Sequence, residues 1–196
     1  MRYNEFSTTD ITFFHSSVSG GKRLYMEHYH TEYELSLLIS GSGTYTVGEK
    51  TYSFTKGDIF LFGSNEIHCI TEIETAEPFD LINIHFEPKV LWNNNINTDI
   101  LLGLFNNKSS SFSNKLDPSN PTTAVIKNII LNIENEFINK EIGYELKIKL
   151  DLFNILMLIL RNYNYVKKAS EIPRIDSNSA SQLAIAINYI NEHLYE

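Results

Sequence analysis

The sequence predicts an α+β protein in which an antiparallel β-barrel or β-sandwich is followed by a helical region. Up to Pro88 the chain consists of short runs rich in β-branched and aromatic residues, separated by Gly, Asn or charged turns. Beyond Pro88 the apolar residues recur at helical spacing. The 196 residues are 42% hydrophobic and 20% charged, so a sizeable core can be buried.

Eight runs before Pro88 predict strands, enough for a small antiparallel sandwich or barrel. Gly48-Glu49 and Gly57-Asp58 are turn signals between them. The predicted strands are 11–17, 23–30, 33–39, 44–47, 51–55, 59–62, 67–73 and 79–86.

The second half predicts two long helices. On the first, one face carries Ile126, Ile129, Ile130, Ile133 and Phe137. The second, over residues 144–163, carries two adjacent apolar stripes. One stripe contains Leu146, Leu150, Phe153, Met157 and Leu160, and the other contains Ile148, Leu152, Ile155 and Ile159. We expect the first stripe to contact a second copy of the chain, the alternative being a central helix enclosed by its own chain.

Charge and cysteine content restrict the setting. The net charge of -8 and pI near 5.3 argue against these residues gripping nucleic acid, because phosphate binding needs a basic surface. Cys69 is the single cysteine, which excludes an intramolecular disulfide and fits a reducing compartment. Neither a signal peptide nor a membrane anchor is visible at the N-terminus, and the second long helix is too interrupted by charges to span a membrane. We expect a cytoplasmic protein.

Polar residues at regular spacing predict a ligand or metal site. His28 and His30 lie one residue apart, so both point to one side of an extended strand, and Glu34 and His68 can join them from nearby strands. Three imidazoles and a carboxylate suit iron, manganese, nickel or zinc. However, Glu34 alternates with Leu35 and Leu37, so it would point away from the histidines if the apolar side were the interior. A bend before Glu34, or helices covering the outer face, would restore the geometry.

The spacing His-x-His-x3-Glu-x6-Gly over residues 28–41, followed by Gly-x10-His over residues 57–68, resembles the two sequence motifs of cupins. The second motif departs from the usual pattern at Gly63, Asn65 and Glu72. Residues 186–193, AINYINEH, are similar to the opening helix of the DNA-binding domain in AraC-family transcription regulators. The chain therefore resembles an AraC-family regulator from about residue 11 to residue 196.

That resemblance implies five segments. They are an N-terminal arm (1–10), a cupin effector-binding barrel (11–88), a helical dimerisation region (89–165), a linker (166–180) and the first helix of a truncated DNA-binding domain (181–196). DNA would then be bound only through a C-terminal domain absent from this chain.

The resemblance also implies a small polar effector, commonly a carbohydrate. The expected contacts are His28, His30, Glu34 and His68, with Phe13 and Tyr25 as apolar walls. The arabinose-responsive family member implies further contacts at Ile70, Leu81 and Asn83, and because none of these three is aromatic, arabinose itself is not expected. His85 shares strand parity with Asn83 and is an outside candidate at the rim.

These observations predict the ligand-sensing and dimerising part of a transcription regulator, without catalytic residues and without a required cofactor. The alternative is a metal-dependent cupin enzyme, an isomerase or dioxygenase, that uses His28, His30, Glu34 and His68.

Overall fold

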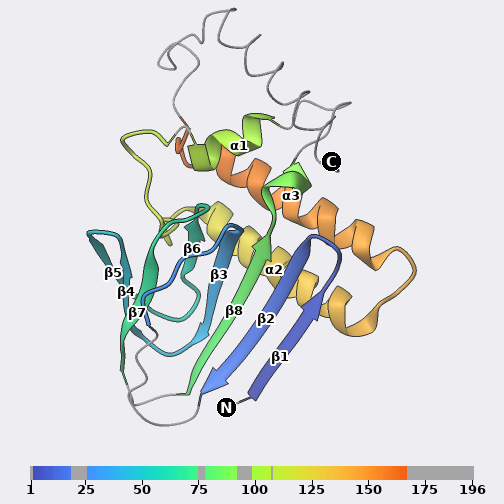
Figure 1. Cartoon of the computed structure of the whole chain (residues 1–196), viewed down its shortest axis with the longest axis horizontal. Coiled ribbons are helices and arrows are strands. Elements are labelled where there is room, and N and C mark those ends of the chain that lie inside the picture. Colours follow the sequence, from blue (N-terminus) through green and yellow to red (C-terminus); the bar gives the residue numbers. More distant parts are fainter. Residues whose placement is uncertain (1, 19–25, 75–77, 92–98, 107, 167–196) are drawn as a thin grey trace, which may run out of the picture. The chain divides into compact units, whose positions relative to one another are not determined.

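Two antiparallel sheets and three helices form the part of the chain that the computed structural model describes, namely residues 2–18, 26–74, 78–91, 99–106 and 108–166 (Figure 1). The larger sheet has the strand order β1 (Arg2–Ser7), β2 (Ile11–Val18), β8 (Phe79–Phe86), β3 (Tyr33–Ser40), β6 (Ile59–Phe62). The smaller sheet has the order β5 (Lys50–Phe54), β4 (Gly43–Val47), β7 (His68–Ile73). The α+β prediction is confirmed, as an open sandwich rather than a closed barrel.

The inner faces of the two sheets pack together through aromatic side chains. Phe60 and Phe62 of β6 lie 4.8 Å and 5.3 Å from Tyr45 of β4, measured between ring centroids. Leu38 and Leu81 complete this inner core from the larger sheet. Two glycines are required beside this core: Gly41 adopts φ 87°, and a Cβ on Gly43 of β4 would meet the Glu72 carbonyl oxygen of the neighbouring strand β7 at 2.1 Å.

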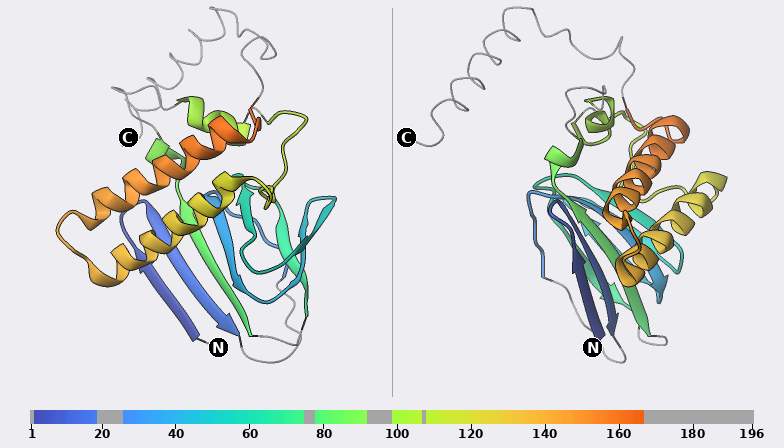
Figure 2. Two further views of the ribbon diagram at one scale, coloured as in Figure 1. Left: turned by 180° about the vertical axis from the view of Figure 1, so that it is seen from behind. Right: turned by 90° about the vertical axis from the view of Figure 1, so that its right-hand side faces the viewer.

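The outer face of the larger sheet is covered by helices (Figure 2). A 3-10 turn (Pro88–Leu91) and α1 (Asp99–Asn106) precede α2 (Pro121–Asn139) and α3 (Tyr144–Asn162). The Asn120 side chain caps α2 by accepting a hydrogen bond from the Thr122 amide, with Pro121 at the first helical position. The predicted face of α2 is confirmed, because all five of its apolar residues are buried against the sheet.

The two edges of the larger sheet differ. Along β6, the loop between α1 and α2 runs as an extra strand-like segment. Leu61 donates its amide hydrogen to the Asn114 carbonyl at 2.8 Å, and Leu116 donates its amide hydrogen to the Ile59 carbonyl at 2.9 Å. Along the other edge, β1 pairs only with β2. Residues 2–7, expected to belong to an arm, therefore form an edge strand among the described residues.

Other boundaries shift slightly. The predicted strand over residues 23–30 is reduced, within its described part, to a single bridge between His28 and His68. Expectations for residues 166–180 and 181–196 fall almost entirely outside the described residues. No described helix has the length and hydropathy of a membrane span.

Candidate functional site

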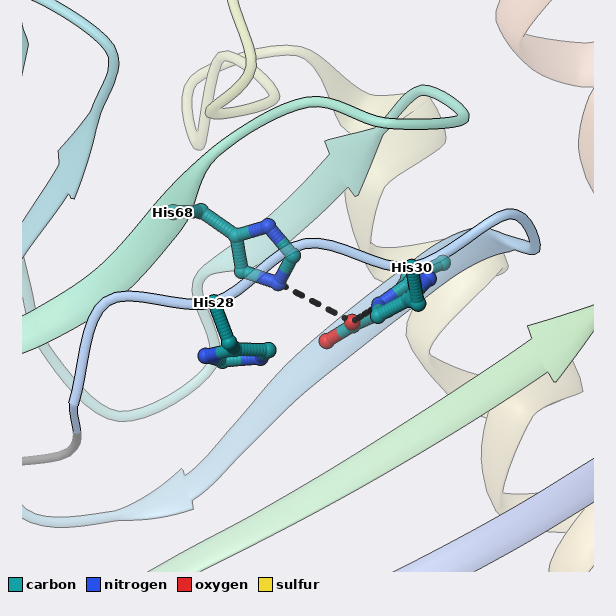
Figure 3. Close-up of side chains that lie close together, drawn as sticks. His28, His30 and His68 are labelled. Atoms are coloured by element: carbon teal, nitrogen blue, oxygen red, sulfur yellow. Dashed lines mark hydrogen bonds and ion pairs between the residues drawn. The ribbon is translucent and has the colours of Figure 1, made fainter.

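The predicted polar side chains meet between the two sheets and come from both of them. Glu34 lies on β3, directly opposite His85 on β8 in the strand register. His68 begins β7, and His28 pairs with it through reciprocal backbone hydrogen bonds of 3.2 Å and 3.0 Å. Figure 3 shows His68 and His30 on either side of a carboxylate, with His28 beside His68. We call His28, His30, Glu34, His68 and His85 the His–Glu group.

A single carboxylate oxygen lies at the centre of this group. Glu34 Oε2 is 2.9 Å from His30 Nε2, 3.2 Å from His68 Nε2 and 3.1 Å from His85 Nε2. The other oxygen, Oε1, accepts a hydrogen bond from the Ser36 hydroxyl at 2.6 Å. Because Glu34 is only 1% exposed, this carboxylate depends almost entirely on protein groups for its stabilisation.

The pKa values reflect this geometry. Burial alone would raise the pKa of Glu34, but the hydrogen bonds of His30 and His68 and the neighbouring His85 outweigh burial and hold that pKa well below its usual value. The hydrogen bond to Glu34 raises the pKa of His30 above the usual histidine value, although burial opposes it. An ionised Glu34 beside a protonated His30 is the state that these shifts favour.

Backbone carbonyls fix which ring nitrogen carries the proton in three of the histidines. Nδ1 of His28, His30 and His68 each contacts the carbonyl oxygen of a residue two positions away, at 3.0, 3.0 and 2.7 Å. A carbonyl oxygen only accepts hydrogen bonds, so each Nδ1 must be the donor. In a neutral imidazole the lone pair is then on Nε2, the nitrogen that His30 and His68 turn toward Glu34.

This arrangement fits a metal ion. Histidines that bind metals usually donate the other ring N–H to a carbonyl or carboxylate, as these three do. Ligand atoms of His28, His30, Glu34 and His68 all lie within 4.8 Å of one another. Ligands at about 2.1 Å from an ion are at most ~4.2 Å apart, so modest side-chain movement would close the group around a cation. Without protons or a cation, the Nε2 lone pairs of His30 and His68 would face a carboxylate oxygen.

The group is attached to the inner core on one side. The Phe62 ring stacks on His68 at 4.2 Å between centroids and 7° between planes. Ser36 Oγ also lies 2.9 Å from Asn83 Oδ1, within hydrogen-bond distance, so Asn83 of β8 adjoins the group. Ile70 and Leu81, which were expected as contacts, are 2% and 3% exposed and form part of the inner core.

On its other side the inner face is open among the described residues. The register places Phe14 of β2 between Asn83 of β8 and Glu5 of β1. Phe14 meets His85 edge-on at 4.9 Å and Tyr3 at 5.9 Å, and Tyr3 is 49% exposed. An aromatic and polar shelf, made of Tyr3, Glu5, Phe14 and Asn83, therefore continues outward from the His–Glu group.

The expected aromatic walls are placed differently. Phe13 lies on the opposite face of the sheet, packed at 5.6 Å against Phe137 of α2, and does not approach the His–Glu group. Its neighbour Phe14 takes that place, because successive residues of a strand point to opposite faces. Tyr25 lies outside the described residues. The alternation of Phe14 with its neighbours was the available signal, but two adjacent phenylalanines made the choice of face ambiguous.

The helices explain how Glu34 can face the histidines although it alternates with Leu35 and Leu37 along β3. Leu35 and Leu37 face outward into the core beneath α2 and α3, whereas Glu34 and Ser36 face the histidines. Both faces of β3 are buried, one against helices and the other against the smaller sheet. The condition that helices cover the outer face is therefore met.

The two stripes of α3 differ in burial. Ile148, Leu152, Ile155 and Ile159 are completely buried in the domain core. Leu146 and Leu150 are 64% and 54% exposed, and Phe153, Met157 and Leu160 are partly buried. Among the described residues, the first stripe is thus exposed at Leu146 and Leu150, in the first turns of α3.

A separate cavity of about 400 Å³ lies between Tyr52, the loop around Asp117 and the end of α3. None of the His–Glu group lines it. Several of its lining groups bond one another, as in the hydrogen bonds from Asn120 to the Asn162 carbonyl at 3.1 Å and from Tyr165 to the Lys115 carbonyl at 3.3 Å. We therefore place the candidate site at the His–Glu group.

Comparison with solved structures shows the fold. The AraC-like transcriptional activator CuxR aligns with a TM-score of 0.59 at 10% identity, covering 99% of this chain and 66% of that chain. A cupin protein from Bacteroides fragilis aligns with a TM-score of 0.42 at 16% identity, covering 47% of this chain and 81% of that chain. A putative mannose-6-phosphate isomerase from Ralstonia eutropha aligns with a TM-score of 0.41 at 11% identity, covering 44% of this chain and 83% of that chain.

Sequence comparison shows the family. A search of curated proteins found no match to the chain. The sequence model of the AraC-like ligand-binding domain, however, matches residues 14–156, which run from within β2 to within α3 and include all of β3 to β8. The chain belongs to the family of AraC-like ligand-binding domains.

Proposed function

We propose that this domain is the sensor of a cytoplasmic transcription regulator and binds a small polar effector at the His–Glu group and the adjoining shelf. The observation that carries the proposal is the open inner face beside a buried, pre-organised polar group. A carbohydrate fits this surface: the Phe14 ring offers an apolar wall to a sugar's C–H face, while Asn83 and the imidazoles offer hydrogen bonds to hydroxyls.

The structure suggests how binding would reach the helices. Glu34 and Leu35 are neighbours on β3 and contact opposite sides of the sheet, the former the histidines and the latter the helical layer. A shift of β3 on effector binding would be transmitted directly to α2 and α3. Binding controls the output only if the effector favours one arrangement over the other.

We further propose that residues 89–165 form a homodimer through the exposed stripe of α3. In the same proposal, DNA is bound by a domain beyond residue 196. The chain then senses and dimerises, and performs no reaction of its own.

A divalent metal ion is a second proposal for the same group. The observation that favours it is the set of Nδ1 hydrogen bonds, which directs Nε2 of His30 and His68 at Glu34 and makes Nε2 the metal-binding nitrogen once those rings are neutral. The ion would supply a positive charge at the centre of the group and open positions for oxygen donors of the effector.

Effector binding is tested by thermal denaturation of the chain against a panel of monosaccharides and sugar acids. An effector at 100 times its Kd stabilises the domain by about 2.7 kcal/mol. We expect His68→Ala and Asn83→Ala to abolish the increase in melting temperature. His15→Ala is the matched control, because His15 contacts Glu134 of α2 at 2.6 Å on the outer face.

Retention of the full response in both His68→Ala and Asn83→Ala would move effector binding to another site. Chemical conversion of a sugar by the wild-type chain, lost in His68→Ala, would favour the enzyme alternative instead.

A further inference from the structure

Two geometric criteria select different donor sets within the His–Glu group. Mutual separation of ligand atoms within 4.8 Å selects His28, His30, Glu34 and His68. Convergence on one point selects a different set, because Glu34 Oε2 lies about 3 Å from the Nε2 atoms of His30, His68 and His85. The two sets differ in one residue, with His28 in the first and His85 in the second.

The surroundings of His85 favour the second set. Its Nε2 is buried and lies 3.1 Å from Glu34 Oε2, but it is the one buried side-chain nitrogen or oxygen among the described residues that has no partner in hydrogen-bond geometry. The His85 ring stacks on His30 at 4.5 Å between centroids and meets Phe14 edge-on. A buried ring nitrogen that faces a carboxylate oxygen without a well-formed hydrogen bond costs free energy, and a proton or a cation between the two atoms removes that cost.

The supporting strands point the same way. His85 and Glu34 are direct cross-strand partners in the central part of the larger sheet, where paired strands fix the backbone on both sides. His28 is exposed and is held to the fold by a single bridge outside the named strands. No hydrogen bond or ion pair joins His28 to Glu34 in the described part of the chain. His30 lies on the same irregular segment but contacts Glu34 Oε2 directly at 2.9 Å, so the comparison decides only between His28 and His85, of which His85 on the paired strand is held more precisely.

We propose that the domain binds one divalent transition-metal ion through His30, His68, His85 and Glu34, with His28 outside the coordination shell. The inference rests on the metal ion proposed above for this group. Bonds from imidazole nitrogen or carboxylate oxygen to such ions are about 2.1 Å long, so an ion near the present position of Oε2 would require each of the three rings to approach by about 1 Å and Oε2 itself to withdraw by about 2 Å.

The test compares two single variants of the 196-residue chain, His85→Ala and His28→Ala. Each protein is stripped with a chelator and titrated with Zn²⁺ in competition with a chromophoric chelator. We expect one Zn²⁺ per wild-type chain, a loss of affinity of at least about tenfold in His85→Ala, and a change of less than about threefold in His28→Ala. His15→Ala is the control for removing an imidazole elsewhere.

A second measurement does not depend on variants. In ¹⁵N-labelled wild-type protein, Zn²⁺ should shift the Nε2 resonances of His30, His68 and His85 and leave those of His28 unchanged. Loss of affinity in His28→Ala together with an unshifted His85 would overturn the assignment.

Absence of any saturable Zn²⁺ binding by the wild-type chain would overturn both this assignment and the metal ion itself. The effector proposal would still be decided by the thermal denaturation panel, which is run on stripped protein as well as on Zn²⁺-loaded protein.

Discussion

At the scale of single residues, the site depends on one buried carboxylate whose charge is balanced by imidazoles. The motif spacing correctly predicted that His30, Glu34 and His68 lie together, because the motif residues fall on segments that become neighbours when the strands pair. It did not include His85 in the group, since the sequence does not show how far along β8 the site extends. Register, which fixes His85 opposite Glu34, is a property of the folded sheet.

The charge balance predicts a pH window for stability. The lowered pKa of Glu34 stabilises the fold at pH above its unfolded value near 4.5, and this contribution is lost as pH falls through the folded value. The raised pKa of His30 stabilises the fold below its unfolded value near 6.5, and this contribution is lost as pH rises through the folded value. The ion pair is therefore strongest between these two limits.

We expect Glu34→Gln to lower the melting temperature of the metal-free chain most between pH 4.5 and 6.5. The difference from wild type should decrease on both sides of that window. Melting curves at half-unit intervals of pH measure it, with Glu32→Gln as a control, because Glu32 is partly exposed and lies 3.7 Å from His30 Nδ1. A difference that does not vary with pH would show that Glu34 acts through packing alone.

At the scale of elements, patterns of alternation predicted most strands, and helical spacing predicted α2 and the two stripes of α3. β1 was missed because its residues are mostly polar and exposed, so burial leaves no alternation to read. The face assignment of β3 was open for the opposite reason, since both of its faces are buried. Which face of such a strand points toward the site depends on the elements that pack on each face, and the strand's own sequence does not contain that information.

The exposed stripe of α3 carries a prediction about assembly. We expect Leu150→Asp to convert a dimer to a monomer, because a carboxylate at a 54% exposed position is tolerated in the free chain and is desolvated in an apolar interface. Sedimentation velocity over a concentration series measures the change. Val125→Asp is the matched control, as Val125 is a 49% exposed apolar residue on α2. A Leu150→Asp chain that remains dimeric would place the interface elsewhere.

At the scale of the whole molecule, the larger sheet separates two functions. Its inner face holds the His–Glu group and its outer face holds the helical layer, so one set of strands is shared by the candidate site and by the proposed dimer region. The sequence predicted the order of these parts from a resemblance in short motifs. It left the effector open, because the shelf beside the group combines residues from β1, β2 and β8, which become neighbours only after folding.

If DNA is bound by a separate domain, as proposed above, this chain alone should bind DNA weakly. The 196 residues carry a net charge of -8, so phosphate groups are on balance repelled by them. We expect no shift of a DNA probe at physiological salt in an electrophoretic assay with micromolar protein. A retarded band that disappears steeply with added salt would show that these residues bind DNA themselves.

The loop segment that pairs with β6, at Asn114 and Leu116, affects how the larger sheet could aggregate through its edges. It occupies the hydrogen-bonding groups at one margin of the larger sheet, so the described residues leave β1 as that sheet's sole margin with unpaired backbone groups. Two copies joined margin to margin through β1 would consume both available margins and offer no further point of addition. Aggregation through the edges of this sheet would therefore stop at a dimer. In this sheet a loop protects the edge, a role that charged residues or proline have in other edge strands.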